Sequence, residues 1–382
     1  MSSWTRLKTG FNEKEIPTHI KFAVAESLLG QGDLGNGFGL VAENIDPENN
    51  QLDAAAFKNN PKSVIVRAKQ GIGDTGFYMR WLPVLKKQTG AKVTVVARPP
   101  ELCFLNALKD QGIIDEVVKA NDVNSGKVQL PQGSYEADFR HLPALLSKNG
   151  VGATKTIKDV PGVDAGYVQP DAAKVKYWEQ ELAQIKGPIV IAGWSASAKA
   201  PTLTSRELDR KYPIGNLLTK LKGSGATVFG VEFGYEQMSS QELGKLQASG
   251  DAVKKNLDAR DVIDSVPSDC TFKSLNKLDF MELMALAKAA EGRGLMVFAD
   301  SGPVNLLGAA QIKNVITCLP KESDWRWGAH GAKWSEYYPT VELLWQQKQG
   351  DWEPVMNEVA KRVHAMAGKH YVAPKDTDEH KN

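Results

Sequence analysis

Two similar units, far apart along the chain, most constrain what it can fold into. Each is an apolar run typical of a buried strand, which ends in a Gly/Asp turn and leads into a run typical of a helix. They are Ser63-Val-Ile-Val-Arg-Ala-Lys-Gln-Gly-Ile-Gly-Asp74 and Leu295-Met-Val-Phe-Ala-Asp-Ser-Gly-Pro303. In open α/β sheets, ligands bind at the carboxyl ends of strands, and helix N-termini hold anions. The two units therefore predict two facing α/β domains with a site between them.

The length of the chain also favours two domains, because a single core stops growing near about 300 residues and this chain has 382. Gly187-Pro188 breaks a helix expected over 171–186, and we place the boundary there. We expect the first domain at 61–186 and the second domain at 187–350. A poorly assigned N-terminal segment, 1–60, should pack on the first domain. A C-terminal helix, 351–371, should pack back toward the first domain, and a disordered tail should follow at 372–382.

Short β-branched runs separated by amphipathic runs predict parallel βαβ units in both halves. We expect strands at 63–68, 92–97, 115–118, 136–140, 188–193, 226–233, 295–299 and 314–318. We expect helices at 75–88, 100–110, 171–186, 214–222, 239–249, 279–291, 303–311 and 352–367. Gly30-Gln-Gly-Asp-Leu-Gly35 matches a dinucleotide fingerprint formally. No strand precedes it and Asn36-Gly-Phe-Gly39 follows where a helix should begin, so we predict a flexible loop instead.

Composition excludes several classes of protein. The formal net charge of +2 gives no strong electrostatic argument for nucleic acid. Cys103, Cys270 and Cys318 are widely spaced, which favours free thiols in a reducing compartment over a zinc site or a disulfide scaffold. No apolar run approaches the roughly 20 residues that span a bilayer. The first residues lack the apolar core of a signal peptide. Together these features predict a cytoplasmic protein.

The first unit offers a carboxylate beside a helix N-terminus. Gly71 and Gly73 would let the backbone approach a ligand closely. Asp74 could accept a proton from an acceptor hydroxyl as a general base. It could equally serve only as the N-cap of a helix that begins at Thr75, and spacing alone fits this second interpretation slightly better.

The second unit offers N–H groups and a further carboxylate. Ser301 or Gly302 could start a helix whose free N–H groups hold a diphosphate or sugar hydroxyls. An ordinary capped helix in a βαβ unit fits the pattern equally well. The segment 193–211 is rich in small residues, hydroxyls and cations, which suits either phosphate binding or a solvated surface loop. Its cations are Lys199, Arg206, Arg210 and Lys211.

An aromatic cluster follows near the C-terminus. Asp324-Trp-Arg-Trp327, Trp334 and Tyr337-Tyr-Pro339 could form a pocket for a base or a sugar face, with Trp325 and Trp327 as its candidate aromatics. They could also pack a long loop onto the core, which composition alone favours. His141 and His330 stand alone, without metal-ligand spacing, so no metal site is expected.

Taken together and in this order, the motifs resemble glycosyltransferase family 9, which includes the heptosyltransferases of lipopolysaccharide synthesis. Gly71-Ile-Gly-Asp74 stands where the family has Gly-Leu-Gly-Asp. The collinear likeness covers roughly residues 63–367 and leaves out the first 60. Its other motifs in the first half are Arg80-Trp-Leu-Pro83, similar to Arg-Tyr-Leu-Pro, and Asp138-Phe-Arg-His-Leu-Pro143, similar to an acceptor-side strand. In the second half, Ile191-Ala-Gly-Trp194 is similar to the strand that opens the second domain, and Asp300-Ser-Gly-Pro-Val-Asn-Leu-Leu-Gly-Ala-Ala310 is similar to Asp-Thr-Ala-x-x-His-Leu-Ala-Gly-Ala-Leu. Asp324-Trp-Arg-Trp327, Tyr337-Tyr-Pro339 and Gly350-Asp-Trp352 resemble the C-terminal stretch of the family.

The resemblance implies a GT-B architecture: two Rossmann-like domains that face a central cleft. It implies transfer from a nucleotide-diphosphate sugar, with inversion at the anomeric carbon and without a metal or other cofactor. Asp74 would be the general base, and Asp300 would hold sugar hydroxyls. Other donor-side residues would be Ser301, Gly302, Asn305, Trp194 and a cation, Arg206 or Lys211. Acceptor-side residues would be Gly71, Gly73, Arg80 and His141.

Two positions depart from the family pattern. Asn305 replaces a His and cannot titrate near neutrality, and Gln311 replaces a Gly. An alternative is therefore a catalytically degenerate protein that binds a nucleotide-sugar or glycan. A third is an interaction module built on residues 1–60.

The acceptor could be a lipopolysaccharide or other glycan, a lipid-linked glycan, a protein side chain or a modified DNA base. A lipid-linked acceptor would place the protein at the inner membrane and would favour an apolar or basic patch near residues 100–150. A DNA acceptor would predict a basic track across the first domain. The candidates for that track are Arg67, Lys69, Arg80, Lys86, Lys87, Lys92 and Arg98.

Overall fold

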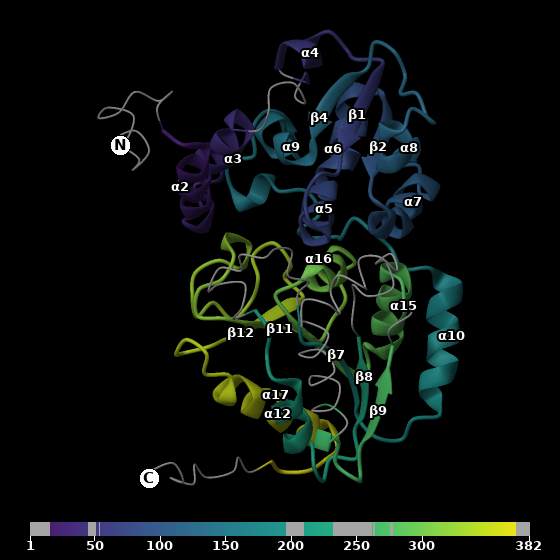
Figure 1. Ribbon diagram of the computed structural model, residues 1–382, viewed down its shortest axis with the longest axis vertical. Helices are drawn as coiled ribbons and strands as arrows, with labels where there is room; N and C mark the ends of the chain where they lie inside the picture. The colour runs from purple at the N-terminus through teal and green to yellow at the C-terminus, as the bar shows by residue number, and fades with distance from the viewer. Residues whose placement is uncertain are drawn as a thin grey trace.

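The computed structural model describes residues 16–44, 51–52, 54–195, 210–231, 262, 264–275 and 278–371. Two α/β units are stacked along the long axis of the molecule, and helices α5 and α16 lie where the units meet (Figure 1). The helix expected at 239–249, the tail 372–382 and two candidate cations, Lys199 and Arg206, lie outside the described residues.

The first unit is built on a four-stranded sheet of order β3-β2-β1-β4, in which every pairing is parallel. Its central strand β1 is buried along its middle, as expected for the Val-Ile-Val run. The strands are β1 (Ser63–Arg67), β2 (Lys92–Ala97), β3 (Glu116–Lys119) and β4 (Tyr135–Asp138). The helices that follow them are α5 (Ile72–Tyr78), η3 (Met79–Trp81), α6 (Leu82–Thr89), η4 (Pro99–Glu101), α7 (Leu102–Asp110), α8 (Ala120–Asn124), η5 (Phe139–His141) and α9 (Leu142–Leu145). A short antiparallel pair, β5 (Leu146–Ser147) with β6 (Gly150–Val151), and η6 (Ile157–Asp159) complete the unit.

The second unit is built on a six-stranded parallel sheet of order β12-β11-β10-β7-β8-β9. The strands are β7 (Ile189–Gly193), β8 (Thr227–Gly230), β9 (Thr271–Ser274), β10 (Gly294–Ala299), β11 (Val315–Leu319) and β12 (Val341–Trp345). The helices of this half are α10 (Ala172–Ala183), α12 (Ile214–Lys220), α15 (Phe280–Ala290), α16 (Gly302–Ala309), η7 (Trp325–Trp327) and α17 (Glu353–Met366). The α/β fold class with two Rossmann-like parallel sheets, predicted from the sequence, is confirmed.

The strand orders locate where each sheet can bind a ligand. In the first sheet the chain runs outward from β1 through β2 to β3 and then returns to β4 on the other side of β1. In the second it runs outward from β7 to β9 and then returns to β10. Crevices for ligands form at such reversals, at the carboxyl ends of the strands. The turn with Asp74 follows β1, and Asp300 follows β10. Both carboxylates therefore lie at a strand where the order of the sheet reverses.

Helices α2 (Thr18–Gly30) and α3 (Leu34–Glu43) correct the flexible loop predicted over residues 30–39. Asp33 starts α3 by accepting a hydrogen bond from the Asn36 N–H group at 3.3 Å. The glycines that suggested a loop instead let the two helices pack closely, since a Cβ atom on Gly37 would lie 2.6 Å from the Leu29 side chain. A third short helix, α4 (Ala54–Lys58), leads to β1.

Helix α17 lies against the second unit, in contrast to the sequence expectation that it would pack back toward the first. Its buried face, which includes Met356 and Val363, joins the hydrophobic cluster of α12, β7 and β10. Figure 1 shows α17 beside α12, at the end of the second unit distant from the first. The apolar stripe of α17 packs against α12, and this hydrophobic burial holds α17 on the second unit.

The two units share one continuous hydrophobic core. Buried residues of the first sheet and its helices belong to the same cluster as those of α15 and α16 in the second unit. One direct link is an edge-to-face contact of Phe104 with Phe280, whose ring centroids lie 6.3 Å apart. No helix in the described part of the chain has the length and apolar character needed to cross a membrane.

Candidate functional site

Asp74 lies in the first turn of α5, directly after the carboxyl end of β1. The helix begins at Ile72, three residues earlier than expected, with Gly71 as its N-cap. Asp74 is therefore not the N-cap. From the third helical position its Oδ2 atom accepts a hydrogen bond from the Gly71 N–H group at 3.1 Å. The side chain remains 30% exposed, enough for a substrate atom to reach it.

Asp300 and Ser301 connect β10 to α16. Ser301 is the N-cap residue, but its hydroxyl donates to the Ala299 carbonyl at 2.9 Å and does not cap the helix. The N–H groups of the first turn of α16 therefore have no capping side chain at Ser301. The helix starts at Gly302 with Pro303 next, as the sequence predicts.

The N-terminal ends of α5 and α16 lie directly against each other. A Cβ atom on Gly73 would lie 3.1 Å from the Asn305 Nδ2 atom and 3.5 Å from the Gly302 Cα atom. A Cβ atom on Gly302 would lie 3.1 Å from the Ile72 side chain. A side chain at either glycine would therefore crowd this contact. The structure brings the two sequence units together at one place.

Arg326 pairs with Asp74 from the other unit, and sequence reasoning did not assign it a role at the site. Its Nη1 atom donates to Asp74 Oδ1, and the Nε and Nη2 atoms of the same guanidinium lie 3.0 and 3.1 Å from the two oxygens of Asp324. Arg326 was visible in the sequence as part of an aromatic cluster. Its partner Asp74 stands 252 positions away, so only the fold reveals the pair.

Arg210 pairs with Asp300 in the second unit. The Arg210 Nε atom donates to the Asp300 carbonyl oxygen at 2.9 Å and lies 3.3 Å from the carboxylate Oδ2 atom. Asp300 itself is buried. One cation of the segment 193–211 therefore reaches this carboxylate. Lys211 is exposed beside it, and Arg206 lies outside the described residues.

Asn305 and Arg80 are buried in one hydrogen-bond network between the units. Asn305 donates to the Ser301 carbonyl at 3.1 Å and accepts from the Tyr338 hydroxyl at 3.1 Å. Arg80 donates to the Tyr167 hydroxyl at 3.1 Å, and its guanidinium lies 4.8 Å from the Tyr338 ring centroid. Arg80 also donates to the Tyr337 carbonyl at 3.4 Å, which links the two units. Both side chains are buried and present no surface to a ligand here.

His141 is fully buried on η5, at the end of β4. Burial lowers its pKa from 6.5 to about 4. Its Nδ1 atom accepts from the Asp138 N–H group at 3.3 Å. The imidazole is therefore neutral at pH 7 and is not exposed to an acceptor in this conformation.

The candidate aromatics pack onto other rings. The Trp325 ring lies 5.4–5.8 Å from the rings of Phe38, Phe77 and Tyr337. Trp327 is buried beside Tyr338, and Trp194 is buried beside Phe272. Of the two interpretations of the C-terminal aromatic cluster, these contacts favour packing.

The basic track expected for a DNA acceptor is largely neutralised. Arg80 is buried, and four other members pair with carboxylates: Arg67 with Glu136, Lys86 with Asp115, Lys92 with Glu116 and Arg98 with Glu101. Such pairing removes most of the positive potential that phosphates would need. The geometry gives a nucleic-acid acceptor little support.

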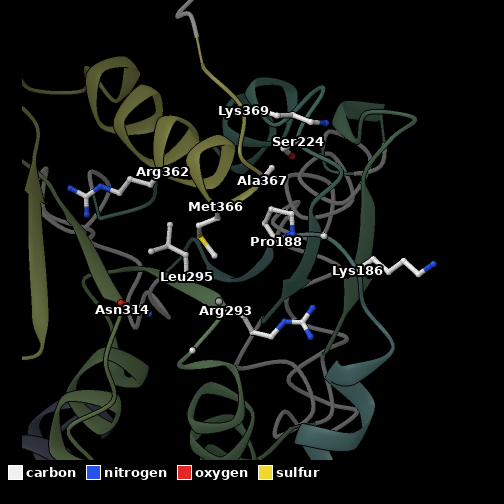
Figure 2. Close-up of a pocket in the computed structure, with 13 residues that line it drawn as sticks. Lys186, Pro188, Ser224, Arg293, Leu295, Asn314, Arg362, Met366, Ala367 and Lys369 are labelled. Carbon is white, nitrogen blue, oxygen red and sulfur yellow. The ribbon is translucent and has the colours of Figure 1, made fainter.

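A hollow of about 850 Å³ lies at the amino ends of the second sheet, the edge opposite to Asp300. Figure 2 shows Leu295, Met366 and Pro188 around it, with Lys186 directed away. Its cations are engaged in structural contacts: Arg293 donates to the Leu182 carbonyl at 3.1 Å, and Arg362 pairs with Glu342. The hollow is therefore not the candidate site.

Across the described ranges, no three or more His, Cys, Asp or Glu side chains are grouped so as to hold a metal ion. The chain matches no family model and no curated protein.

Solved glycosyltransferases are similar to the chain. One is a glycosyl transferase family 9 protein from Veillonella parvula, at 12% identity and a TM-score of 0.44, over 79% of this chain and 91% of that one. Another is the E. coli heptosyltransferase WaaC with ADP, at 11% and 0.40, over 78% and 98%. A third is Anabaena HepE in complex with UDP and glucose, at 11% and 0.39, over 82% and 96%.

Proposed function

We propose that the protein is an inverting glycosyltransferase that uses a nucleotide-diphosphate sugar and needs no metal. One observation carries the proposal: a partly exposed carboxylate after β1 and an uncapped helix N-terminus after β10 meet at the reversals of two facing parallel sheets. The first supplies a base for an acceptor hydroxyl, and the second supplies donors for a diphosphate.

Each group then has one part in the transfer. The Asp74 carboxylate accepts the proton of the acceptor hydroxyl as that oxygen forms a bond to the anomeric carbon. The bond from this carbon to the diphosphate oxygen breaks, and its electron pair stays with the diphosphate. The N–H groups at the start of α16 stabilise that developing charge. Asp300, fixed by Arg210, accepts hydrogen bonds from sugar hydroxyls.

Metal independence follows from this assignment, because N–H groups and a cation of the segment 193–211 would take the place of a divalent ion at the diphosphate. Transfer that persists in excess EDTA would support it. Loss of transfer in EDTA, with recovery on adding Mg²⁺ or Mn²⁺, would overturn that part of the proposal.

The contact between Gly73 and Gly302 implies a movement of the two units during the cycle. A diphosphate at the start of α16 would occupy space that Gly73 and Ile72 fill in this conformation. The units therefore separate to admit the donor and close again around it, as lids and domains do in many transferases.

Donor identity can be found by binding before any acceptor is known. WaaC was solved with ADP and HepE with UDP and glucose, so ADP-sugars and UDP-sugars come first in a thermal-shift panel. A donor at 100 times its dissociation constant adds about 2.7 kcal/mol of stability, which such a screen detects. No shift with any nucleotide-sugar would contradict the proposal.

Substitution of the base separates an enzyme from a protein that only binds the donor. Asp74→Asn should leave donor binding nearly unchanged and lower turnover by about 10²-fold or more, because the amide cannot take the proton. Donor hydrolysis or transfer to a panel of glycan, lipid-linked glycan and protein acceptors gives the readout. Donor binding without turnover in both proteins would indicate the degenerate binding protein. Equal turnover would remove Asp74 as base.

A further inference from the structure

Arg326 belongs to the second unit but contacts Asp74, the candidate base, which belongs to the first. It lies on η7, which follows β11 of the second sheet, whereas Asp74 lies on α5 of the first. Its side chain is 15% exposed and that of Asp74 is 30% exposed. An ion pair between two partly buried groups on different domains is more than a surface contact, because little solvent screens it.

Asp324 fixes the orientation of the Arg326 guanidinium. Its two carboxylate oxygens lie 3.0 and 3.1 Å from the Nε and Nη2 atoms of Arg326, the paired geometry in which an arginine is most strictly oriented. The same group lies 5.7 Å from the Phe77 ring centroid and 5.5 Å from that of Trp325. The remaining Nη1 nitrogen donates to Asp74.

The N-terminal helices fix the position of η7 on the first unit. The Trp325 ring, next to Arg326, contacts Phe38 of α3 edge-to-face at 5.8 Å. Gly30 at the end of α2 lies close to it, since a Cβ atom there would be 3.7 Å from the Trp325 Cβ atom. Residues that the family resemblance does not cover thus hold the segment that carries Arg326.

Both oxygens of Asp74 have a partner in this arrangement. Oδ2 accepts from the Gly71 N–H group at 3.1 Å, and Oδ1 accepts from Arg326. The two contacts fix the plane of the carboxylate, and each oxygen keeps a second lone pair for an incoming hydroxyl. Gly71 belongs to the first unit, so only the contact with Arg326 depends on how the units are placed.

We infer that Arg326 is a positioning residue for the base: it orients the Asp74 carboxylate only when the second unit is closed on the first. The inference rests on the proposed transferase function. It ties proton removal from the acceptor to contact between the two units.

The test compares Arg326→Met and Arg326→Lys with a matched control, Arg362→Met. Arg362 is also held by two carboxylates, Glu342 and Glu358, and its side chain is 28% exposed, but it lies on α17. Turnover, the Michaelis constants and the donor dissociation constant are measured with the donor found in the thermal-shift screen. Guanidinium chloride at low millimolar concentration is added to each variant.

Arg326→Met should lower kcat by about 10-fold or more, because a misplaced catalytic group costs this much. Its donor dissociation constant should stay within about twofold, since Arg326 is not assigned to the donor. Arg326→Lys should retain more activity, and guanidinium should restore part of kcat in Arg326→Met alone. A merely structural arginine would show neither rescue nor a loss confined to kcat.

Three results would overturn the inference. Turnover of Arg326→Met equal to that of Arg362→Met would remove Arg326 from the mechanism and leave the proposed function standing. A loss of kcat without rescue by Lys or guanidinium would assign Arg326 to stability only. Absence of transfer by the wild-type protein with every donor and acceptor would remove the proposed function and this inference with it. If Arg326→Met does not fold, Arg326→Lys and Asp324→Asn decide, with reduced kcat and unchanged donor binding expected.

Discussion

At the scale of single residues, the two candidate carboxylates differ in how they are held. Asp74 is partly exposed and shares its oxygens between its own helix and Arg326. Asp300 is buried, and Arg210 binds both its carbonyl and its carboxylate. A carboxylate fixed in this way can orient sugar hydroxyls. The geometry therefore agrees with a base at Asp74 and a holding group at Asp300.

Asp300→Ala should weaken donor binding by about 10-fold or more. The change removes an acceptor for sugar hydroxyls and leaves the Arg210 guanidinium without its carboxylate, and breaking a buried charge pair is costly. Calorimetric titration with the donor measures the effect. Asp269→Ala is the control, because Asp269 accepts from the N–H groups of Gly223 and Gly225 in a turn at the amino ends of the second sheet, far from Asp300 along the strands. An unchanged dissociation constant in Asp300→Ala would take Asp300 out of the donor site.

Single residues also show what the sequence could reveal about the site. Asp74 and Asp300 could be found because each follows an apolar strand and a glycine turn within a dozen residues. Arg326 and Arg210 could not be assigned to them, because their partners lie 252 and 90 positions away. Arg80 and His141 were placed on the acceptor side by resemblance, whereas here both side chains are buried. A local sequence motif does not show whether its side chains are buried in the folded protein.

At the scale of elements, the candidate site is formed mainly by the N-terminal ends of α5 and α16, which contact each other. Sequence periodicity predicted most strands and helices of both sheets, since their apolar runs are short and regular. It missed β9 and β12, the two edge strands of the second sheet, and α3, whose three glycines suggested a loop. In α3 tertiary packing against α2 outweighs the low helix propensity of glycine. The close approach of α5 to α16 likewise depends on tertiary packing, which the sequence of either helix alone does not show.

Gly73→Ala should slow transfer several-fold by crowding the contact of α5 with α16. The added methyl group would lie 3.1 Å from Asn305 Nδ2 and 3.5 Å from Gly302 Cα, so the two units must shift by a few tenths of an ångström. A shift of that size misplaces Asp74 relative to α16. Turnover under saturating donor gives the measurement.

Gly39→Ala is the matched control for this substitution. Gly39 lies inside α3, and nothing stands within 4 Å of a Cβ atom there. The change should leave turnover unaltered and raise the free energy of unfolding by about 0.5–1 kcal/mol, because alanine favours the helix. Equal turnover in Gly73→Ala and Gly39→Ala would show that the contact of the two helices has no part in catalysis.

At the scale of the whole molecule, the two units share a hydrophobic core and a buried, hydrogen-bonded seam. The apolar cluster runs through both, and Arg80 of the first unit donates to the Tyr337 carbonyl of the second at 3.4 Å, beside Tyr167, Tyr338 and Asn305. The sequence predicted two domains from length and repeat, but it could not predict this seam, which joins residues from four separate segments. The segment 1–60 was expected to pack on the first domain, and its helices α2 and α3 also reach η7 of the second.

The burial of His141 within the first unit makes the stability of the molecule depend on pH. Burial lowers the pKa of His141 to about 4, against 6.5 for the exposed group, and the charges beside it are Asp138 and Arg140. The folded state therefore resists a proton that the unfolded chain accepts below pH 6.5. Stability from this group is complete above pH 6.5 and falls as the pH drops toward 4. By pH 4.5 the loss amounts to about 2–3 kcal/mol.

His141→Asn should remove that part of the acid sensitivity, because Asn has no proton to gain and its Oδ1 atom can still accept from the Asp138 N–H group. At pH 7 the variant should be less stable than the wild type, since the smaller side chain leaves a cavity. Between pH 6.5 and 4.5 its free energy of unfolding should fall less steeply. Urea unfolding followed at several pH values measures both slopes. Parallel slopes would mean that His141 is not the group whose protonation couples acid to unfolding, and the neutral, buried imidazole assigned here would be wrong.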